Sequence, residues 1–263
     1  NPDCINQNYR VIYVIAEKES MIIEFTGPSG CGKTTAIYAS RDFLLEKGIS
    51  PLVIAEGEST TKFQINECIT DSSKHGIRTD LTVFFPALFF FLINIRFTFF
   101  IIRNVFKLSG GASIYITVLR SVWRKIGILA YLKKIKYKSL VVLFDEGSVH
   151  SAHNVLVDVS SDVDVAAIKE FSKLTPFADI TVIQTASESI LVKRIHERGD
   201  WSPRVNNEEE LNKFTKNSVR LYKNLSKELQ KSPTKLLVIN SMVSTPKNIA
   251  EQLSSLIWEI NNK

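Results

Sequence analysis

A glycine-rich segment follows directly on a short apolar stretch near the start of the chain. Residues 27–34 read Gly-Pro-Ser-Gly-Cys-Gly-Lys-Thr and match the pattern G-x-x-x-x-G-K-[ST] at every fixed position. The preceding residues, Met21–Thr26, have the composition of a buried strand. The residues that follow, up to about Lys47, are typical of a helix that ends at Gly48. The sequence therefore predicts a strand, a tight loop and a helix in this order, as a phosphate-binding loop requires.

The composition of the loop indicates its chemistry. Glycine lets the main chain turn tightly, so that consecutive N–H groups can surround a polyphosphate. Lys33 is expected to reach the β- and γ-phosphates, and the Thr34 hydroxyl is expected to bind Mg²⁺. Cys31 is interpreted as a small filler residue. We expect ATP, or alternatively GTP, to be bound by Gly27, Pro28, Ser29, Gly30, Cys31, Gly32, Lys33, Thr34 and Thr35.

Two acidic residues follow a second apolar stretch. Leu140–Phe144 has the composition of a buried strand, and Asp145 and Glu146 come directly after it. A carboxylate at this place can hold Mg²⁺, so Asp145 is predicted to be a metal ligand together with Thr34. Glu146 is predicted to accept the proton of an attacking hydroxyl group or to orient that group.

His150 and His153 come shortly after these acids and would share one face of a helix. Three interpretations are open for them. They could bind a metal together with a carboxylate, line the pocket of a second substrate, or be ordinary helix residues.

A basic segment follows the apolar residues Ile180–Thr185. Arg194 and Arg198 lie one helical turn apart, and Arg204 follows a polar turn. Guanidinium groups on a mobile segment are suited to stabilise the charge of a phosphoryl group in transfer. A mobile lid is therefore predicted at about 198–206. The complete set of predicted catalytic residues is Lys33, Glu146, Arg194, Arg198 and Arg204. The alternative for these arginines is a solvated, basic helix end.

Apolar stretches of strand length alternate with helical segments after Met21, which predicts an α/β domain over residues 21–263. The further strands are expected at Pro51–Ala55 and Lys235–Ile239. Residues 1–20 are treated as an N-terminal extension, either an additional edge strand at 9–16 or a segment outside the functional unit. Helices are expected near Ser148–Asp158, Glu188–Glu197 and Pro246–Ile260.

Residues 80–138 are atypical and are predicted to form a helical insert. Leu81–Ile95 contains no charged residue, and nine of the 16 phenylalanines lie between Phe84 and Phe106. The insert could be a buried subdomain that shapes an apolar pocket. It could instead contact a membrane surface or a lipid-linked acceptor through residues 81–106, with the basic residues at anionic headgroups, or span the membrane. The headgroup set would be Arg96, Arg103, Lys107, Arg120, Arg124 and Lys125.

The net charge and the cysteine content limit the kinds of ligand and the cellular compartment that fit this sequence. The net charge of +6 favours anionic ligands or anionic membrane surfaces, and no run of five like charges indicates a tail for nucleic acid. The three cysteines, Cys4, Cys31 and Cys68, form neither a disulfide framework nor a zinc motif. Together with a start that lacks the pattern of a signal peptide, they indicate a cytoplasmic protein with the membrane association still open. A homodimer also stays open.

Three segments resemble motifs of P-loop kinases of the nucleoside monophosphate kinase group, thymidylate kinase in particular. They are MIIEFTGPSGCGKTT, DEGS with the histidine that follows it, and SESILVKRIHERGDW with a later arginine. The resemblance covers most of residues 21–261 in the order of elements. It implies a three-layer P-loop NTPase fold with a mostly parallel five-stranded sheet in the order 2-3-1-4-5. It also implies that the adenine lies between the base of the lid and residues 240–244.

The chain departs from this family at the end of the third strand. Thymidylate kinases carry Asp-Arg there and deoxynucleoside kinases carry Glu-Arg, whereas this chain has Asp145-Glu146. The usual contact to the phosphate of an acceptor is therefore missing or comes from elsewhere. We expect an ATP-dependent kinase for an unidentified small molecule. The alternative is a nucleotide-dependent ATPase or switch that acts on a partner or a membrane through the phenylalanine-rich insert.

Overall fold

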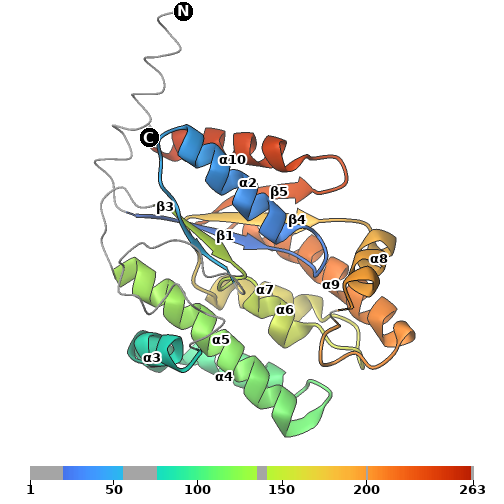
Figure 1. Ribbon diagram of the computed structural model, residues 1–263. Coiled ribbons are helices and arrows are strands. Elements are labelled where there is room, and N and C mark those ends of the chain that lie inside the picture. Colours follow the sequence, from blue (N-terminus) through green and yellow to red (C-terminus); the bar gives the residue numbers. More distant parts are fainter. Residues whose placement is uncertain (1–19, 56–75, 135–140, 200, 262–263) are drawn as a thin grey trace, which may run out of the picture.

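Five parallel strands form the centre of the computed structural model, which describes residues 20–55, 76–134, 141–199 and 201–261 (Figure 1). The strand order is β2-β3-β1-β4-β5, and each of the described strand pairs is parallel. This confirms the predicted fold class and strand order. The edge strand considered at 9–16 lies outside the described residues. The strands are β1 (Met21–Thr26), β2 (Leu52–Ile54), β3 (Val141–Asp145), β4 (Ile180–Thr185) and β5 (Lys235–Asn240).

Helices cover both faces of the sheet, which makes three layers (Figure 1). On one face, α2 and α10 pack against Ile23, Phe25 and Val182, and on the other face α5 packs against Ile22 and Val142. Neighbouring residues of a strand point to opposite faces, and all six residues of β1 are buried because helices cover both faces, although Glu24 and Thr26 are polar. The helices are α2 (Lys33–Glu46), α3 (Gly76–Ile93), α4 (Ile95–Val105), α5 (Gly111–Lys134), α6 (Ser151–Leu156), α7 (Val165–Leu174), α8 (Glu188–Arg198), α9 (Glu208–Leu229) and α10 (Pro246–Asn261).

The insert is helical, as predicted, and consists of α3, α4 and α5. It is neither fully buried nor fully exposed, because Phe97 and Phe100 belong to the core while Phe85 and Phe99 face solvent. Among the described residues, no single helix is both long and apolar enough to cross a membrane. Only the pair Thr82–Ile93 and Ile95–Val105 reaches that composition when the two are taken together, and the pair is bent by 100°.

Two predictions about the insert and its surroundings need correction. Lys125 does not belong to a set of headgroup contacts, because its side chain is buried and forms an ion pair with Glu146 at 3.3 Å. The helix predicted at Ser148–Asp158 is confined to Ser151–Leu156, since the chain first makes a turn and becomes extended again at Val157. Helices α7 and α9 were not predicted. Their buried apolar residues recur at helical spacing, as Leu211, Phe214, Leu221 and Leu225 do in α9, and α7 packs on α9.

A buried carboxylate in the middle of β1 holds the turn that precedes α6. Glu24 is fully buried, and its side chain accepts hydrogen bonds from the N–H groups of Val149 and His150 and from the Ser148 hydroxyl, at 3.0 to 3.2 Å. The turn approaches so closely that a Cβ on Gly147 would lie 2.7 Å from this carboxylate. Burial raises the pKa of Glu24 to about 7, although these hydrogen bonds act in the opposite direction. Glu24 therefore fixes the segment that carries Glu146 and His150.

The raised pKa of Glu24 predicts a specific pH dependence of stability. The folded pKa of about 7 lies above the ordinary value of 4.5, so the folded state retains a proton that the unfolded state loses. Stability from this group is fully present below pH 4.5 and is lost as the pH rises towards 7, by about 1.4 kcal/mol per pH unit. Denaturant unfolding of the wild type and of Glu24→Gln from pH 5 to 8 measures it. The wild type should lose stability relative to the variant with rising pH, and parallel curves would contradict the assignment.

Candidate functional site

The loop between β1 and α2 has the backbone that its glycines allow. Gly27, Gly30 and Gly32 have φ angles of +153°, +79° and +92°. A Cβ on Gly27 would lie 2.2 Å from the carbonyl oxygen of Gln184, whereas a Cβ on Gly32 would meet nothing within 4 Å. Gly27 is therefore required for the close packing of the loop on β4, and Gly32 for the left-handed conformation that starts α2. Cys31 is buried, in line with its interpretation as a filler residue.

Lys33 is the basic group at the centre of the loop. Its ammonium group donates to the carbonyl oxygens of Gly27 and Pro28 at 3.2 and 3.3 Å and lies 3.2 Å from Oε1 of Glu146. Burial by itself would lower the pKa of Lys33, but neighbouring negative groups, Glu146 and Asp145 among them, raise it above its ordinary value. Lys33 is therefore a fixed positive charge at neutral pH.

Thr34 and Asp145 lie together beside Lys33 and present only oxygen atoms. The Thr34 hydroxyl is 3.5 Å from Oδ2 of Asp145. Both residues border a hollow of about 520 Å³ that Gly30, Gly32 and Lys33 also line. Hydroxyl and carboxylate oxygens are the ligands that Mg²⁺ prefers, and it binds through few protein ligands when phosphates supply others. The two residues thus fit the predicted metal site.

Glu146 is the residue at which the charges of the site converge. It is the one residue other than glycine with a positive φ in the described part of the chain, +54°, a conformation that β3 and the Glu24 turn impose. Its carboxylate lies 3.2 Å from Lys33, 3.3 Å from Lys125 and 3.2 Å from Nε2 of His150. Burial would raise the pKa of Glu146, but His150 and the two lysines lower it well below its usual range. Glu146 is therefore ionised at neutral pH.

His150 connects Glu146 to a buried hydroxyl network. Burial holds the pKa of His150 well below its ordinary value, so the ring is neutral. Because the carboxylate can only accept, Nε2 carries the ring proton and donates to Glu146, and Nδ1 accepts from the Tyr222 hydroxyl at 2.9 Å. The Tyr222 oxygen is also 3.0 Å from the Thr26 hydroxyl. The network ties the end of β1 and α9 to the orientation of Glu146.

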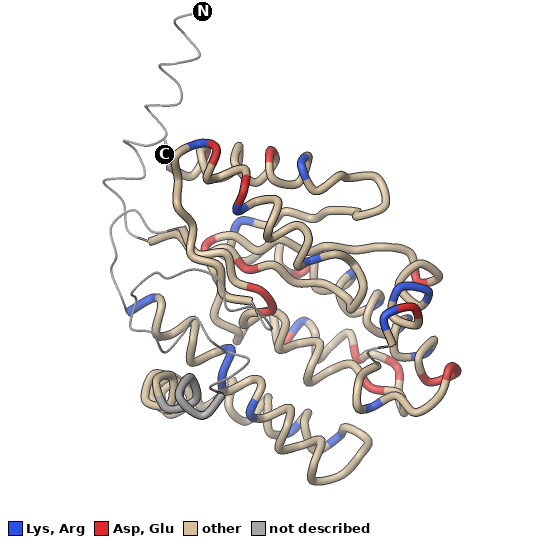
Figure 2. Tube along the Cα trace, viewed as in Figure 1, with Lys and Arg blue, Asp and Glu red and all other residues tan. Residues whose placement is uncertain are grey.

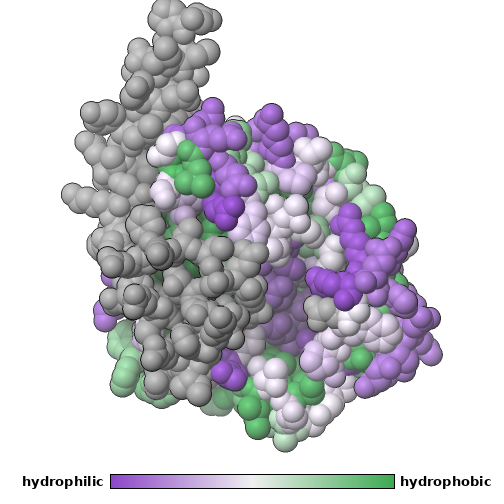
Figure 3. Space-filling model, in the orientation of Figure 1, coloured by the Kyte–Doolittle hydropathy of each residue, from purple (hydrophilic) through white to green (hydrophobic). Residues whose placement is uncertain are grey.

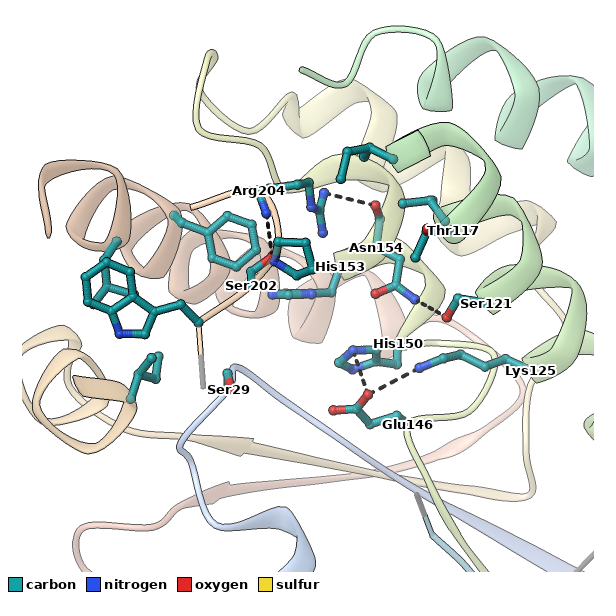
Figure 4. A pocket seen from close by; sticks show the side chains of 17 residues that line it. Ser29, Thr117, Ser121, Lys125, Glu146, His150, His153, Asn154, Ser202 and Arg204 are labelled. Atoms are coloured by element: carbon teal, nitrogen blue, oxygen red, sulfur yellow. Dashed lines mark hydrogen bonds and ion pairs between the residues drawn. The ribbon is translucent and has the colours of Figure 1, made fainter. Parts of the chain in front are cut away.

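A pocket of about 360 Å³ opens on the far side of Glu146 from the loop (Figure 4). Helix α5 contributes Thr117, Ser121 and Lys125 to its wall, and α6 contributes His153 and Asn154. The segment after α8 and the start of α9 add Trp201, Ser202, Arg204 and Phe214. Ser29 and Glu146 line both this pocket and the hollow at the loop. The two spaces therefore meet at these two side chains.

His153 is a buried polar group whose ring nitrogens have no hydrogen-bond partner in the described part of the chain. Its ring stacks on Tyr222 with centroids 6.1 Å apart and meets the edge of Phe214 at 5.4 Å. Burial, and next the charge of Arg204, lower the pKa of His153 to about 3, so the imidazole is neutral. A neutral ring can both donate and accept one hydrogen bond. His153 faces the pocket with this capacity unused (Figure 4).

The predicted lid arginines divide into two groups. Arg194 donates to the carbonyl oxygen of Gly30 at 3.1 Å, and Arg198 donates to the Ser29 hydroxyl at 2.8 Å. Both guanidinium groups thus lie at the phosphate loop. Arg204 lies instead in the wall of the pocket, where it donates to the carbonyl oxygens of Asn154 and Val157 and covers the ring of Phe214. Burial lowers the pKa of Arg204 to about 10.

The structure brings the loop, Asp145, Glu146, Arg194 and Arg198 together, while the predicted contact of the adenine with residues 240–244 stays a prediction. Metal binding by the histidine pair gains no support, because no group of three or more potential ligand residues occurs in the described residues. Sequence reasoning missed Glu24, Lys125 and Tyr222. The acid in the otherwise apolar strand MIIEFT was a visible signal for Glu24, whereas nothing in the sequence distinguishes Lys125 or Tyr222 from their neighbours.

Comparison with known proteins found no matching family model and no matching curated protein. Among solved structures, a deoxyadenosine kinase from M. mycoides is similar with a TM-score of 0.47 and 15% identity, over 91% of this chain and 100% of that one. A thymidylate kinase from Ehrlichia chaffeensis has a TM-score of 0.44 and 14% identity, over 91% of this chain and 100% of that one. The fold itself is established by the strand order and the loop.

Loss of the Lys33 ammonium should weaken binding of Mg·ATP. The ammonium group is fixed within the loop and makes charge-assisted contacts, so Lys33→Ala should cost at least about 2 kcal/mol of binding free energy, roughly 30-fold in Kd. Titration calorimetry measures the effect. Lys247→Ala, which removes an exposed lysine of α10, serves as the control and should bind as the wild type does. Equal affinity of all three proteins would contradict the assignment of the loop.

Proposed function

We propose that this protein is an ATP-dependent phosphotransferase that acts on a small hydroxyl-bearing molecule bound in the pocket between α5, α6 and the segment after α8. The observation that carries the proposal is the position of Glu146. Its side chain borders both the hollow at the phosphate loop and the pocket, and it touches Lys33 on one side and Lys125 and His150 on the other. A group that joins two substrate spaces in this way is suited to transfer between them.

Each side chain then has a role that follows from its chemistry. The loop amides, Lys33, Arg194 and Arg198 would hold and neutralise the phosphates, and Thr34 and Asp145 would hold Mg²⁺. When bound, the metal would reduce the negative charge of the phosphates. Glu146 would accept a hydrogen bond from the acceptor hydroxyl and direct its oxygen at the γ-phosphorus. Its low pKa makes it a weak base, which suffices because in a loose transition state the proton leaves late.

The walls of the pocket indicate the class of acceptor. Lys125 shares the single Glu146 carboxylate with Lys33, and Arg204 donates to two carbonyl oxygens, so the donor groups of both cations are largely engaged within the protein and offer few hydrogen bonds to a phosphate. Hydroxyl and amide groups of Ser121 and Asn154 and the neutral His153 can bind hydroxyls, while Trp201 and Phe214 offer ring surfaces. The pocket therefore favours an uncharged molecule with hydroxyl groups and an apolar ring or chain, and nucleosides belong to this class.

The proposal is tested by transfer of labelled γ-phosphate from ATP to a panel of nucleosides, nucleotides, sugars and lipid extracts. We expect slow loss of ATP from the protein alone and a marked acceleration with an acceptor, with uncharged hydroxyl compounds ahead of their phosphates. Lys33→Ala should abolish the labelled product. If wild type and Lys33→Ala label the same compounds equally, the proposal is wrong. Acceleration by a protein partner or by vesicles without a labelled product would support the ATPase or switch instead.

Replacement of the Glu146 carboxylate should separate binding from transfer. Glu146→Gln keeps the shape of the side chain but removes the charge beside Lys33, so nucleotide affinity should be unchanged or higher. The rate of transfer should fall by about 10²-fold or more, in the range known for removal of an acid–base group. Single-turnover transfer and nucleotide titration of the same samples measure the two effects. A Glu146→Gln protein with full transfer activity would exclude the assigned role.

A further inference from the structure

The insert exposes an unusual concentration of large apolar side chains. Ten of the 16 exposed large hydrophobic residues of the described chain lie between Phe84 and Ile116, although this segment is a small part of the protein. Scattered exposed apolar residues are normal, whereas a contiguous group of this kind marks a contact surface. We call the six most central of them the apolar face; they are Phe85, Phe89, Leu92, Ile93, Ile95 and Phe99, each at least 58% exposed.

The apolar face is held in place by aromatic packing on its inner side. Phe90 and Phe91 meet Phe97 at 5.7 and 6.0 Å between ring centroids, and Phe91 stacks on Trp123 at 5.1 Å. Phe97 and Phe100 then pack on Phe171 of α7. The outer residues therefore face solvent because the inner faces of α3 and α4 are already used for the core.

The bend between α3 and α4 gives the apolar face its shape. The two helices meet at Asn94 with a bend of 100°, so neither continues the other across a bilayer. The Asn94 amide donates to the carbonyl oxygen of Phe90, and the Thr98 hydroxyl donates to that of Phe91 at 2.7 Å. Polar main-chain groups at the break are thereby satisfied within the protein. Such a bent pair can lie in a membrane interface with Leu92, Ile93 and Ile95 at its tip.

The segment of the chain that carries this face is basic, although Glu170 of α7 pairs with Arg103 at its edge. Ten of the 33 basic residues and none of the 27 acidic residues lie between Leu81 and Phe144, so this segment has a charge of +10. The remaining chain has 23 basic and 27 acidic residues and a charge of −4, which together give the net +6. Figure 2 shows blue but no red segments along α5, and Figure 3 shows hydrophobic surface along the lower edge of the molecule, where the insert lies. Arg96 is exposed on α4, and Lys107 is exposed in the turn that follows α4.

We propose that the apolar face docks the protein on an anionic lipid surface, with its side chains between the headgroups and with Arg96 and Lys107 at lipid phosphates. Apolar burial and attraction to anionic headgroups add in such a contact. A second copy of the chain fits the surface less well. In a symmetric dimer the two segments 81–144, each with ten basic residues and no acidic one, would meet with like charges. The inference does not depend on the identity of the phosphoryl acceptor.

Flotation of the protein of residues 1–263 with lipid vesicles, in the absence of nucleotide, tests the docking. We expect co-flotation with vesicles of phosphatidylcholine and phosphatidylglycerol, and little with phosphatidylcholine alone. The double variant Phe89→Ser/Phe99→Ser should reduce the bound fraction about tenfold or more, because it removes two exposed rings. Leu45→Ser/Val165→Ser removes two exposed apolar side chains of α2 and α7 and should bind as the wild type does. Since all four positions are exposed, the unfolding midpoints should stay close to that of the wild type.

A second double variant, which removes two positive charges, keeps the test decisive if Phe89→Ser/Phe99→Ser folds poorly. Arg96→Gln/Lys107→Gln changes only exposed side chains, and it should weaken flotation with anionic vesicles and reduce its sensitivity to salt. Absence of wild-type flotation with anionic vesicles would overturn the proposal. Equal losses in the phenylalanine pair and the α2/α7 pair would do so as well. A stable dimer that the phenylalanine variant dissociates, without vesicle binding by the wild type, would assign the face to self-association.

Discussion

The ion pairs of Glu146 with Lys33 and Lys125 are the interaction on which the arrangement of the site depends. Two buried ammonium groups each lie within 3.3 Å of one carboxylate at the end of β3, and this carboxylate makes both positive charges tolerable. Lys33 belongs to the phosphate loop and Lys125 to the insert. A single carboxylate therefore connects the part of the fold that binds phosphates with the part that forms the pocket wall.

The position of Glu146 is itself determined by a second buried carboxylate. Glu24 uses its oxygens to hold the N–H groups of Val149 and His150, and Glu146, which has a left-handed conformation, lies just before the turn that these bonds fix. His150, Tyr222 and Thr26 then fix the direction of its side chain. Polar groups without water must be satisfied by such networks, and a satisfied network permits few alternative arrangements. This gives the site its rigidity before any substrate binds.

Helix α5 has two roles that the sequence does not separate. Its inner side supplies Thr117, Ser121 and Lys125 to the pocket, while the insert to which it belongs exposes the apolar face and the basic residues. If the proposed docking occurs, the same helical unit would hold the acceptor and contact the lipid surface. Some residues of the segment 81–144 thus form the wall of the pocket, and others form the proposed lipid contact. The structure assigns different residues to each of these two roles.

Local pattern determined the phosphate loop, the α/β class and the acidic pair after β3, because these depend on short-range rules: glycine for positive φ, alternating apolar strands and helices, and acids at a strand end. The strand order was implied by the resemblance to P-loop kinases and not by local pattern. Strand bounds were predicted to within about a residue for this reason. The sequence could not show that Lys125 turns inward while Arg96 and Lys107 stay outside, or that Arg204 lies in the pocket and not at the loop. It also could not show Tyr222 beside His150, 72 residues away in sequence. The positions of these side chains follow from the packing of distant segments, which only the tertiary structure determines. The physical reason is that a lysine or a tyrosine is stable both at the surface and in the interior, provided that its polar group has a partner.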